Sequence, residues 1–334
     1  VQQGVRADLD KVVSGTQFTR LTCGRAPLVN RQCKRVAEFL RRFDYPAAAS
    51  LLEDVLAQSD LPHSMAEPLR YQLALARGLN AWDRFDHATA WTLLSPLRSR
   101  HVDLLKFLQA VVSSRRRLDP EFERQAGSVI RVAARGHGYE LVEDLLLNAE
   151  RRASQGRYDD AVARLYRALE MLAQARLRLA YGIDTSALQT IDLPVDIRPI
   201  YNSRKEGPGG TTQLALKDAY ELLALLATVG PEPVGNAYVE KRGHLLDFLA
   251  VRNRSLYAHG FTPVTEAQYR KAESLVVDFC RECVQAILAS GEVRRPYAGP
   301  VQFPREAVYS AENERPWPVG PGHPQAYSGE AQDS

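Results

Sequence analysis

Apolar side chains recur at intervals of three and four residues along most of the chain between residues 30 and 290. This spacing gathers them on one face of a helix, so it predicts amphipathic helices. No alternating strand–helix pattern follows residue 30, and we therefore expect an all-α protein. The helices expected in the first part of the chain cover residues 36–43, 47–56, 68–79, 88–97 and 102–114.

The strongest helical pattern lies in residues 121–181. A long helix is expected at residues 158–181, because an apolar stripe runs through Ala161, Leu165 and Leu172. Prolines and glycines interrupt the pattern between residues 182 and 212 and predict a loop. The remaining helices are expected at residues 139–155, 214–228, 237–259 and 265–290.

Similar corners join the predicted helices. Phe43-Asp44, Phe85-Asp86 and Tyr158-Asp159 each precede a small residue and then a large one at the same spacing. Each Asp suits an N-cap, with its aromatic neighbour packed on the preceding turn. The separations of 42 and 73 residues are too irregular for a tandem repeat, so we expect an irregular helix-turn-helix layer. Asp83 is also interpreted as a cap, and His87 is expected to be solvated.

Composition adds limits to this helical picture. The chain has 334 residues, 45% of them hydrophobic, and a net charge of +3. A charge this small excludes the class of strongly basic proteins that coat nucleic acids. The predicted division is an irregular segment at 1–30, a helical domain at 31–120, a second helical domain at 121–290 and a proline- and glycine-rich tail at 291–334. We expect this tail to lack stable structure or to wrap loosely over the surface.

The four cysteines indicate a reducing compartment, and we expect a cytoplasmic protein. Cys280 and Cys283 form a C-x-x-C within a predicted helix, but no second tight pair or histidine partner accompanies them. We therefore interpret them as buried helix residues and expect no metal site. No apolar run approaches the roughly 20 residues that cross a bilayer, so no membrane partner is expected.

The most informative stretch is residues 251–260, Val-Arg-Asn-Arg-Ser-Leu-Tyr-Ala-His-Gly. Gly260, with Pro263 just beyond, predicts the end of a helix at that point. At about 100° per residue, Arg252 and His259 are about 700° apart and project from nearly the same side, whereas Arg254 is roughly 140° out of line with His259. A guanidinium and an imidazole on one face make a small phosphate site, because arginine binds oxygens and histidine exchanges protons near neutral pH.

The order Arg252-Asn253…His259 resembles the Arg-x(4–6)-His signature of HEPN ribonucleases, in which a polar residue often follows the arginine. Arg254…His259 fits the spacing too, so the main catalytic arginine stays undecided between Arg252 and Arg254. The phrase Arg-Asn-x-Ser-x-x-Ala-His-Gly is similar to the catalytic segment of the ancillary ribonucleases of type III CRISPR systems, which join a CARF sensor to a C-terminal HEPN nuclease. Phrases at residues 80–88 and 156–170 resemble helical parts of the same proteins.

The resemblance implies a helical bundle of HEPN type at residues 121–290, preceded by the irregular helix-turn-helix layer. It implies that two copies form a homodimer with one composite active site, where single-stranded RNA is cleaved without metal or cofactor in CRISPR antiviral defence. The 2′-hydroxyl attacks the adjacent phosphate. His259 transfers protons, Arg252 stabilises the phosphorane charge and Asn253 orients the phosphate or His259. The supporting or RNA-binding residues implied are Arg254, Ser255, Tyr257, Arg204 and Lys205.

In the family, cyclic oligoadenylate bound by the sensor activates the nuclease. A sensor needs an α/β domain of well over a hundred residues, and we expect it to be absent from this chain or represented only by its final edge. Two other hypotheses remain open at this point. The fold could serve as a catalytically inactive binding module, or the chain could be a helical-repeat adaptor in which the cations of the last turn merely complement the helix dipole.

Overall fold

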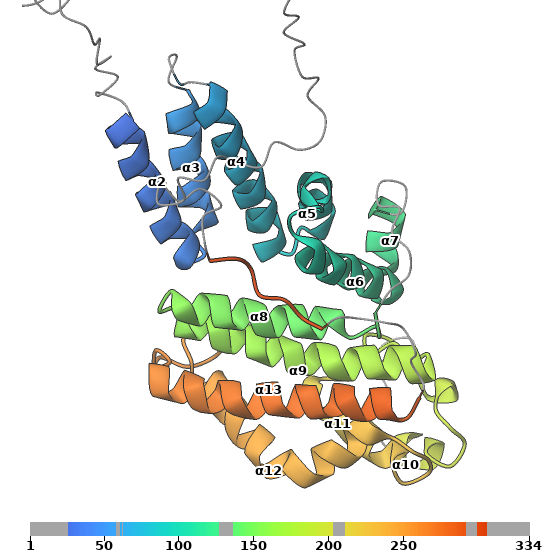
Figure 1. Ribbon diagram of the computed structural model, residues 1–334. Helices are drawn as coiled ribbons and strands as arrows, with labels where there is room; N and C mark the ends of the chain where they lie inside the picture. The colour runs from blue at the N-terminus through green and yellow to red at the C-terminus, as the bar shows by residue number, and fades with distance from the viewer. Residues whose placement is uncertain are drawn as a thin grey trace, which may run out of the picture.

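The computed structural model describes residues 26–57, 61, 63–126, 136–202, 211–291 and 299–305. Within these ranges the protein is all-α, as the periodicity predicts (Figure 1). A first layer contains the helices α2 (Ala26–Arg41), α3 (Tyr45–Leu56), α4 (His63–Asp83), α5 (His87–Leu94), α6 (Val102–Leu118) and α7 (Pro120–Ala126), with a 3₁₀ turn at Ser95–Leu97. These helices pack through a core of their own.

The second layer is a bundle of long helices lying below the first (Figure 1). Its members are α8 (Glu140–Ser154), α9 (Tyr158–Tyr181), α11 (Leu216–Leu226), α12 (Pro233–Asn253) and α13 (Glu266–Ala289). α9 has the predicted bounds and is the central helix, contacting the four others. Its stripe of Leu165, Ala168 and Leu172 is fully buried because neighbours cover it on several sides.

The segment between α9 and α11 is only partly loop. It holds a 3₁₀ turn (Thr190–Asp192), the short helix α10 (Arg198–Asn202) and the strands β1 (Leu188–Gln189) and β2 (Thr211–Thr212). The strands pair antiparallel, with Leu188 opposite Thr212. The sequence pattern does not predict this two-stranded element, because each strand is too short to show alternation.

Two of the predicted helix corners are confirmed. The side chains of Asp44 and Asp86 accept hydrogen bonds from the backbone N–H groups three residues on, at 3.2 and 3.1 Å. The preceding Phe43 and Phe85 have positive φ angles of 56° and 61°, the conformation that turns the chain into the next helix. The third corner differs, because Gly156 takes the positive-φ position and Asp159 therefore lies inside α9 instead of capping it.

The interpretation of Asp83 as a cap and the expectation of a solvated His87 are both wrong. Asp83 ends α4, and its carboxylate accepts hydrogen bonds from Arg151, at 2.8 Å, and from Arg152 of α8. His87 is completely buried, and its Nε2 lies 3.0 Å from the carboxylate of Asp144. The reason is tertiary: the two layers close over the start of α5, which local sequence cannot reveal.

Residues 299–305 run back across α8 to the first layer as an extended strap (Figure 1). Phe303 is buried, with its ring centroid 4.8 Å from that of Trp82. The guanidinium of the fully buried Arg151 lies 3.8 Å from the centre of the Phe303 ring. The expectation of a loosely attached tail is therefore wrong for this segment, because an aromatic anchor fixes it between the layers. Residues 306–334 lie outside the described ranges.

The cysteine interpretation is confirmed where the structure describes these residues. Cys33, Cys280 and Cys283 are free thiols buried within helices. Burial raises the pKa of the Cys280 thiol. Across the described ranges no group of three or more His, Cys, Asp or Glu side chains could hold a metal ion. None of the helices in those ranges is long and apolar enough to span a membrane.

Candidate catalytic site

The helix that carries the arginine motif is fixed to α9 at its first turn. The buried carboxylate of Glu232 accepts a hydrogen bond from the backbone N–H of Val234 at 3.0 Å and so caps α12. The same carboxylate accepts from the guanidinium of Arg176 at 2.8 Å and from the hydroxyl of Tyr181 at 2.7 Å. Burial and the bond to Glu232 raise the pKa of the Tyr181 hydroxyl, which therefore stays a donor. These contacts set the direction of α12.

The helix ends earlier than the sequence predicts. α12 stops at Asn253, and Arg254 is its C-cap. The expectation that one helix continues to His259 is therefore wrong, and so is the angular argument that puts Arg252 and His259 on one helical face. Ser255 is buried and forms an isolated bridge with Thr262, which draws the chain away from the helix axis. A contact distant along the chain thus overrides the local helical pattern.

A compact turn nevertheless returns His259 to the end of α12. The backbone N–H of His259 donates to the carbonyl of Asn253 at 3.3 Å, and that of Gly260 donates to the carbonyl of Ser255 at 3.1 Å. At Gly260 a Cβ atom would lie 1.8 Å from the carbonyl oxygen of Arg254, so only glycine permits this crossing of the backbone. The glycine that was expected to stop a helix instead closes a turn.

The segment after the turn is also anchored to α9. The carboxylate of Asp159 accepts a hydrogen bond from the backbone N–H of Val264 at 3.0 Å. The side chain of Thr265 then caps α13 through the backbone N–H of Gln268. The turn at residues 254–263 is therefore held between two helices whose ends are both fixed.

Arg252 is the oriented arginine of the motif. Its guanidinium lies 4.2 Å from the centre of the Tyr166 ring, a cation–π contact with α9. Its Nη1 donates to the side-chain oxygen of Asn253 at 3.1 Å. Arg254 is exposed, and its Nε donates to the carbonyl of Ala250 at 3.3 Å, along its own helix. Only Arg252 is thus supported by a second helix.

His259 and its neighbours face outward. The imidazole of His259 is exposed, and it makes no hydrogen bond or ion pair to any part of the chain that the structure describes. Tyr257 is 61% exposed, whereas Ser255 is buried beneath the turn. Arg204 and Lys205 lie outside the described residues. An accessible imidazole can exchange protons, and an oriented guanidinium can bind a phosphate oxygen.

Tyr166 is the residue that sequence reasoning missed. Arg164, Arg167 and Glu170 recur every three residues and form a polar edge along α9. Arg164 and Arg167 line a cavity beneath the first layer, and the α9 residue that contacts Arg252 is the aromatic Tyr166. No sequence signal distinguishes Tyr166 from a core aromatic.

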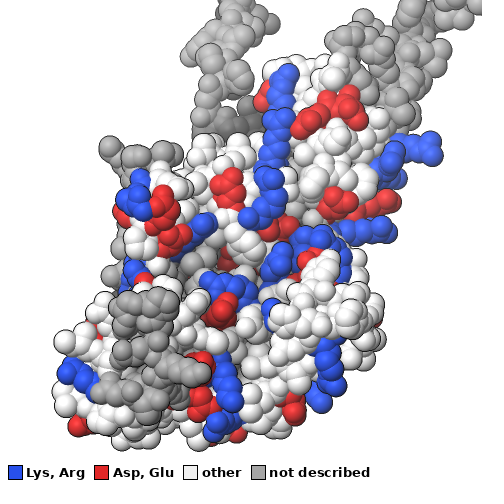
Figure 2. All heavy atoms as spheres, turned by 180° about the vertical axis from the view of Figure 1, so that it is seen from behind, with Lys and Arg blue, Asp and Glu red and all other residues white. Residues whose placement is uncertain are grey.

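The surface charge is mixed. Figure 2 shows basic and acidic side chains interspersed over one face of the molecule, in keeping with the net charge of +3. This face therefore carries no broad basic surface of the kind that binds a polyanion without local contacts.

The all-α bundle defines a class of fold, the HEPN helical bundle. Residues 131–282 match the family described as the Csm6 HEPN domain, and the motif at residues 252–259 lies inside the match. The resemblance to the HEPN proteins of type III CRISPR systems is thereby confirmed, and the match supports a CRISPR-associated HEPN ribonuclease in general. A comparison with curated proteins gave no match.

Proposed function

We propose that this protein is an endoribonuclease that cleaves single-stranded RNA without a metal ion, at a site shared by two copies of the chain. The observation that carries the proposal is the turn whose backbone returns the exposed His259 to the end of α12, the same helix end that carries the oriented Arg252. We propose the same domain limits that the sequence predicts, with the nuclease domain at residues 121–290.

The chemistry needs only groups that RNA and this motif supply. The 2′-hydroxyl of the RNA attacks the adjacent phosphorus and loses its proton to an imidazole of His259. The bond from phosphorus to the 5′-oxygen breaks, and that oxygen takes a proton from the second His259, which begins the step as the protonated imidazolium. The products are a 2′,3′-cyclic phosphate and a 5′-hydroxyl, with protons and charge in balance.

Arg252 supplies positive charge where the phosphorane becomes more negative. Its contact with Tyr166 holds the guanidinium in one place before substrate arrives, so less ordering is needed during the reaction. Asn253 fixes the guanidinium and offers an amide to a phosphate oxygen. Arg254 is the exposed cation that contacts the neighbouring RNA backbone, and Tyr257 offers an exposed ring for a base to stack on.

A second copy completes the site, because one His259 cannot serve as base and acid in the same step. The surface beside the motif supports this pairing. Three apolar side chains of the turn are exposed, Leu256 at 50%, Tyr257 at 61% and Phe261 at 93%. Val239 and Leu246 on α12 are exposed as well. Exposed apolar side chains of this kind are typical of a surface that another copy of the chain covers.

The experiment is RNA cleavage in EDTA by the wild type and by His259→Ala and Arg252→Ala variants. We expect each substitution to abolish nearly all cleavage, and the wild-type products to carry 2′,3′-cyclic phosphate ends. Adding excess His259→Ala protein to the wild type should lower activity, because mixed dimers lack one imidazole. Equal cleavage by wild type and His259→Ala would disprove the proposal.

Regulation by a cyclic oligoadenylate is part of the proposal and rests on the family match alone. It is tested by adding linear and cyclic oligoadenylates to the cleavage assay. Activation by a cyclic form in this chain or in a longer protein that contains it would support the regulation, and unchanged rates in both would exclude it.

A further inference from the structure

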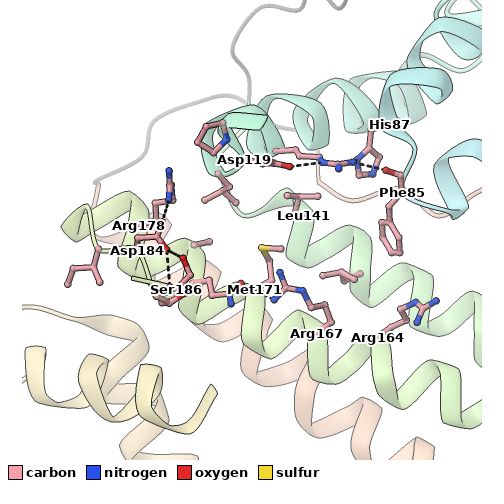
Figure 3. A pocket seen from close by; sticks show the side chains of 18 of the residues that line it. Phe85, His87, Asp119, Leu141, Arg164, Arg167, Met171, Arg178, Asp184 and Ser186 are labelled. Atoms are coloured by element: carbon pink, nitrogen blue, oxygen red, sulfur yellow. Dashed lines mark hydrogen bonds and ion pairs between the residues drawn. The ribbon is translucent and has the colours of Figure 1, made fainter. Parts of the chain in front are cut away.

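A cavity of about 710 Å³ lies where the first layer meets the bundle. Its walls are the start of α5, the end of α6, the start of α8, one face of α9 and the residues just after α9 (Figure 3). This volume is within the range of sites for small organic ligands. It is separate from the motif, because the α9 residue that contacts Arg252 is Tyr166, which does not line the cavity.

The walls carry an excess of positive charge. Four arginines line the cavity against two aspartates, which leaves two positive charges uncompensated within the lining. Arg178 donates to Asp184 at 3.2 Å, and Arg115 lies 3.7 Å from Asp119. The charged groups of α6 and of the segment after α9 are therefore largely paired within the lining. Arg167 is paired with Glu170, which lies outside the lining, so the unpaired charge lies on Arg164 of α9.

Arg164 is the informative member of this set. It is half-buried, and its Nε donates to the side-chain oxygen of Asn148 at 3.2 Å. Among the described residues it forms no ion pair with a carboxylate. Burial lowers the pKa of its guanidinium, so the charge is held there at a cost that an anion in the cavity would offset. Arg167, one turn further along α9, forms an ion pair with Glu170 at 2.7 Å. Its side chain lines the cavity and is more than a third exposed.

The rest of the wall is apolar. The side chains of Leu118, Leu141, Met171 and Ile183 line the cavity, and the ring of Phe85 lies at the end near Arg164 (Figure 3). An inorganic anion gains no binding energy from an apolar wall of this kind. Nucleoside phosphates combine an anionic group with a flat, largely apolar base, and an aromatic ring beside arginines suits both parts.

We propose that the cavity between α6 and α9 is a binding site for a nucleoside phosphate, with its phosphate held by Arg164 and Arg167 and its base against Phe85 and Met171. The ligand contacts both layers at once. It therefore stabilises the folded protein by an amount that rises with the logarithm of its concentration once that concentration exceeds the Kd. The proposal does not depend on the ribonuclease chemistry proposed for His259.

Binding is measured by isothermal titration calorimetry on the full chain with AMP, ATP, ribose 5-phosphate and inorganic phosphate. AMP and ATP should bind and should raise the melting temperature, and ribose 5-phosphate and inorganic phosphate should bind more weakly. Arg164→Ala and Arg167→Ala should each weaken AMP binding by roughly tenfold or more, because each removes a charge-assisted hydrogen bond. Arg281→Ala, on the exposed face of α13, is the control and should change nothing.

The site is excluded if neither AMP nor ATP binds at millimolar concentration. It is also excluded if the wild type and a correctly folded Arg167→Ala variant bind them equally well. Binding of a short single-stranded RNA that is weakened by Arg164→Ala, without binding of AMP, would assign the cavity to RNA instead. The His259→Ala variant separates this proposal from the ribonuclease: AMP binding should persist there, and its loss would place the nucleotide at the motif.

Discussion

The guanidinium of Arg252 lies over the ring of Tyr166, 4.2 Å from its centre, and so joins the end of α12 to the middle of α9. An arginine on a frayed helix end would sample many rotamers. The aromatic ring selects one region of space, and Asn253 adds a hydrogen bond that fixes the plane of the guanidinium. The packing of α12 against α9 therefore fixes the position of the positive charge of Arg252 in advance.

This relationship predicts that Tyr166→Leu lowers kcat/KM for RNA cleavage about 2- to 30-fold, the equivalent of a cation–π contact of ~0.5–2 kcal/mol. Tyr166→Phe keeps the ring and should remain close to the wild type. Steady-state kinetics on a short fluorogenic RNA would measure both. Equal losses in the two variants would show that the hydroxyl or the packing, and not the ring face, matters.

Gly260→Ala should inactivate the protein while leaving the bundle folded. The added Cβ cannot share space with the carbonyl oxygen of Arg254, so the turn must open and His259 must move. A displacement of about 1 Å at a catalytic group costs on the order of 100-fold in rate. The matched control is Gly230→Ala, since a Cβ at Gly230 meets nothing within 4 Å. Circular dichroism and cleavage rates, measured together, decide between local and global effects.

Phe303→Ala should destabilise the whole chain. Phe303 is fully buried between Trp82 and Arg151, and large-to-small changes of this kind cost about 3–5 kcal/mol. The control Ile191→Ala removes a side chain that is 70% exposed and should change stability by less than about 0.5 kcal/mol. Urea unfolding followed by fluorescence measures the difference. Similar midpoints for the two variants would mean that the strap contributes little.

Phe261→Asp should weaken dimerisation and activity in parallel. The side chain is 93% exposed in the isolated chain, so its replacement leaves the fold unchanged, but a carboxylate in an apolar interface would lack a partner. We expect the dimer dissociation constant to rise at least tenfold, as for an interface hot spot. Analytical ultracentrifugation measures it, with Ile191→Asp as the control. A monomeric wild type that cleaves RNA would exclude the shared site.

The sequence predicts the fold better than it predicts the site. The apolar period of α9 gives its bounds because its stripe is long and packed against several neighbours. The N-caps at Asp44 and Asp86 are local, and they too can be read from the chain. The strap at Phe303 escapes prediction, since a single aromatic among prolines carries no periodic signal.

The motif shows where local reasoning fails. The residue types and their order predict phosphate chemistry, and that stays a prediction, but the helix ends six residues before His259. The cause is a bridge between Ser255 and Thr262 and a close backbone approach at Gly260, both of which need the folded chain. Tyr166 and the buried His87 are missed for the same reason, because each depends on which helices become neighbours.

The close backbone approach at Gly260 also affects how strictly the number of residues between the arginine and the histidine must be kept. In a continuous helix, each inserted or deleted residue would rotate the imidazole by about 100° and remove it from the arginine. Here the imidazole is delivered by a loop whose two ends meet, so its direction depends on where the loop closes and not on how many residues it contains. Such a closure accommodates arginine–histidine separations of different length with the same chemistry.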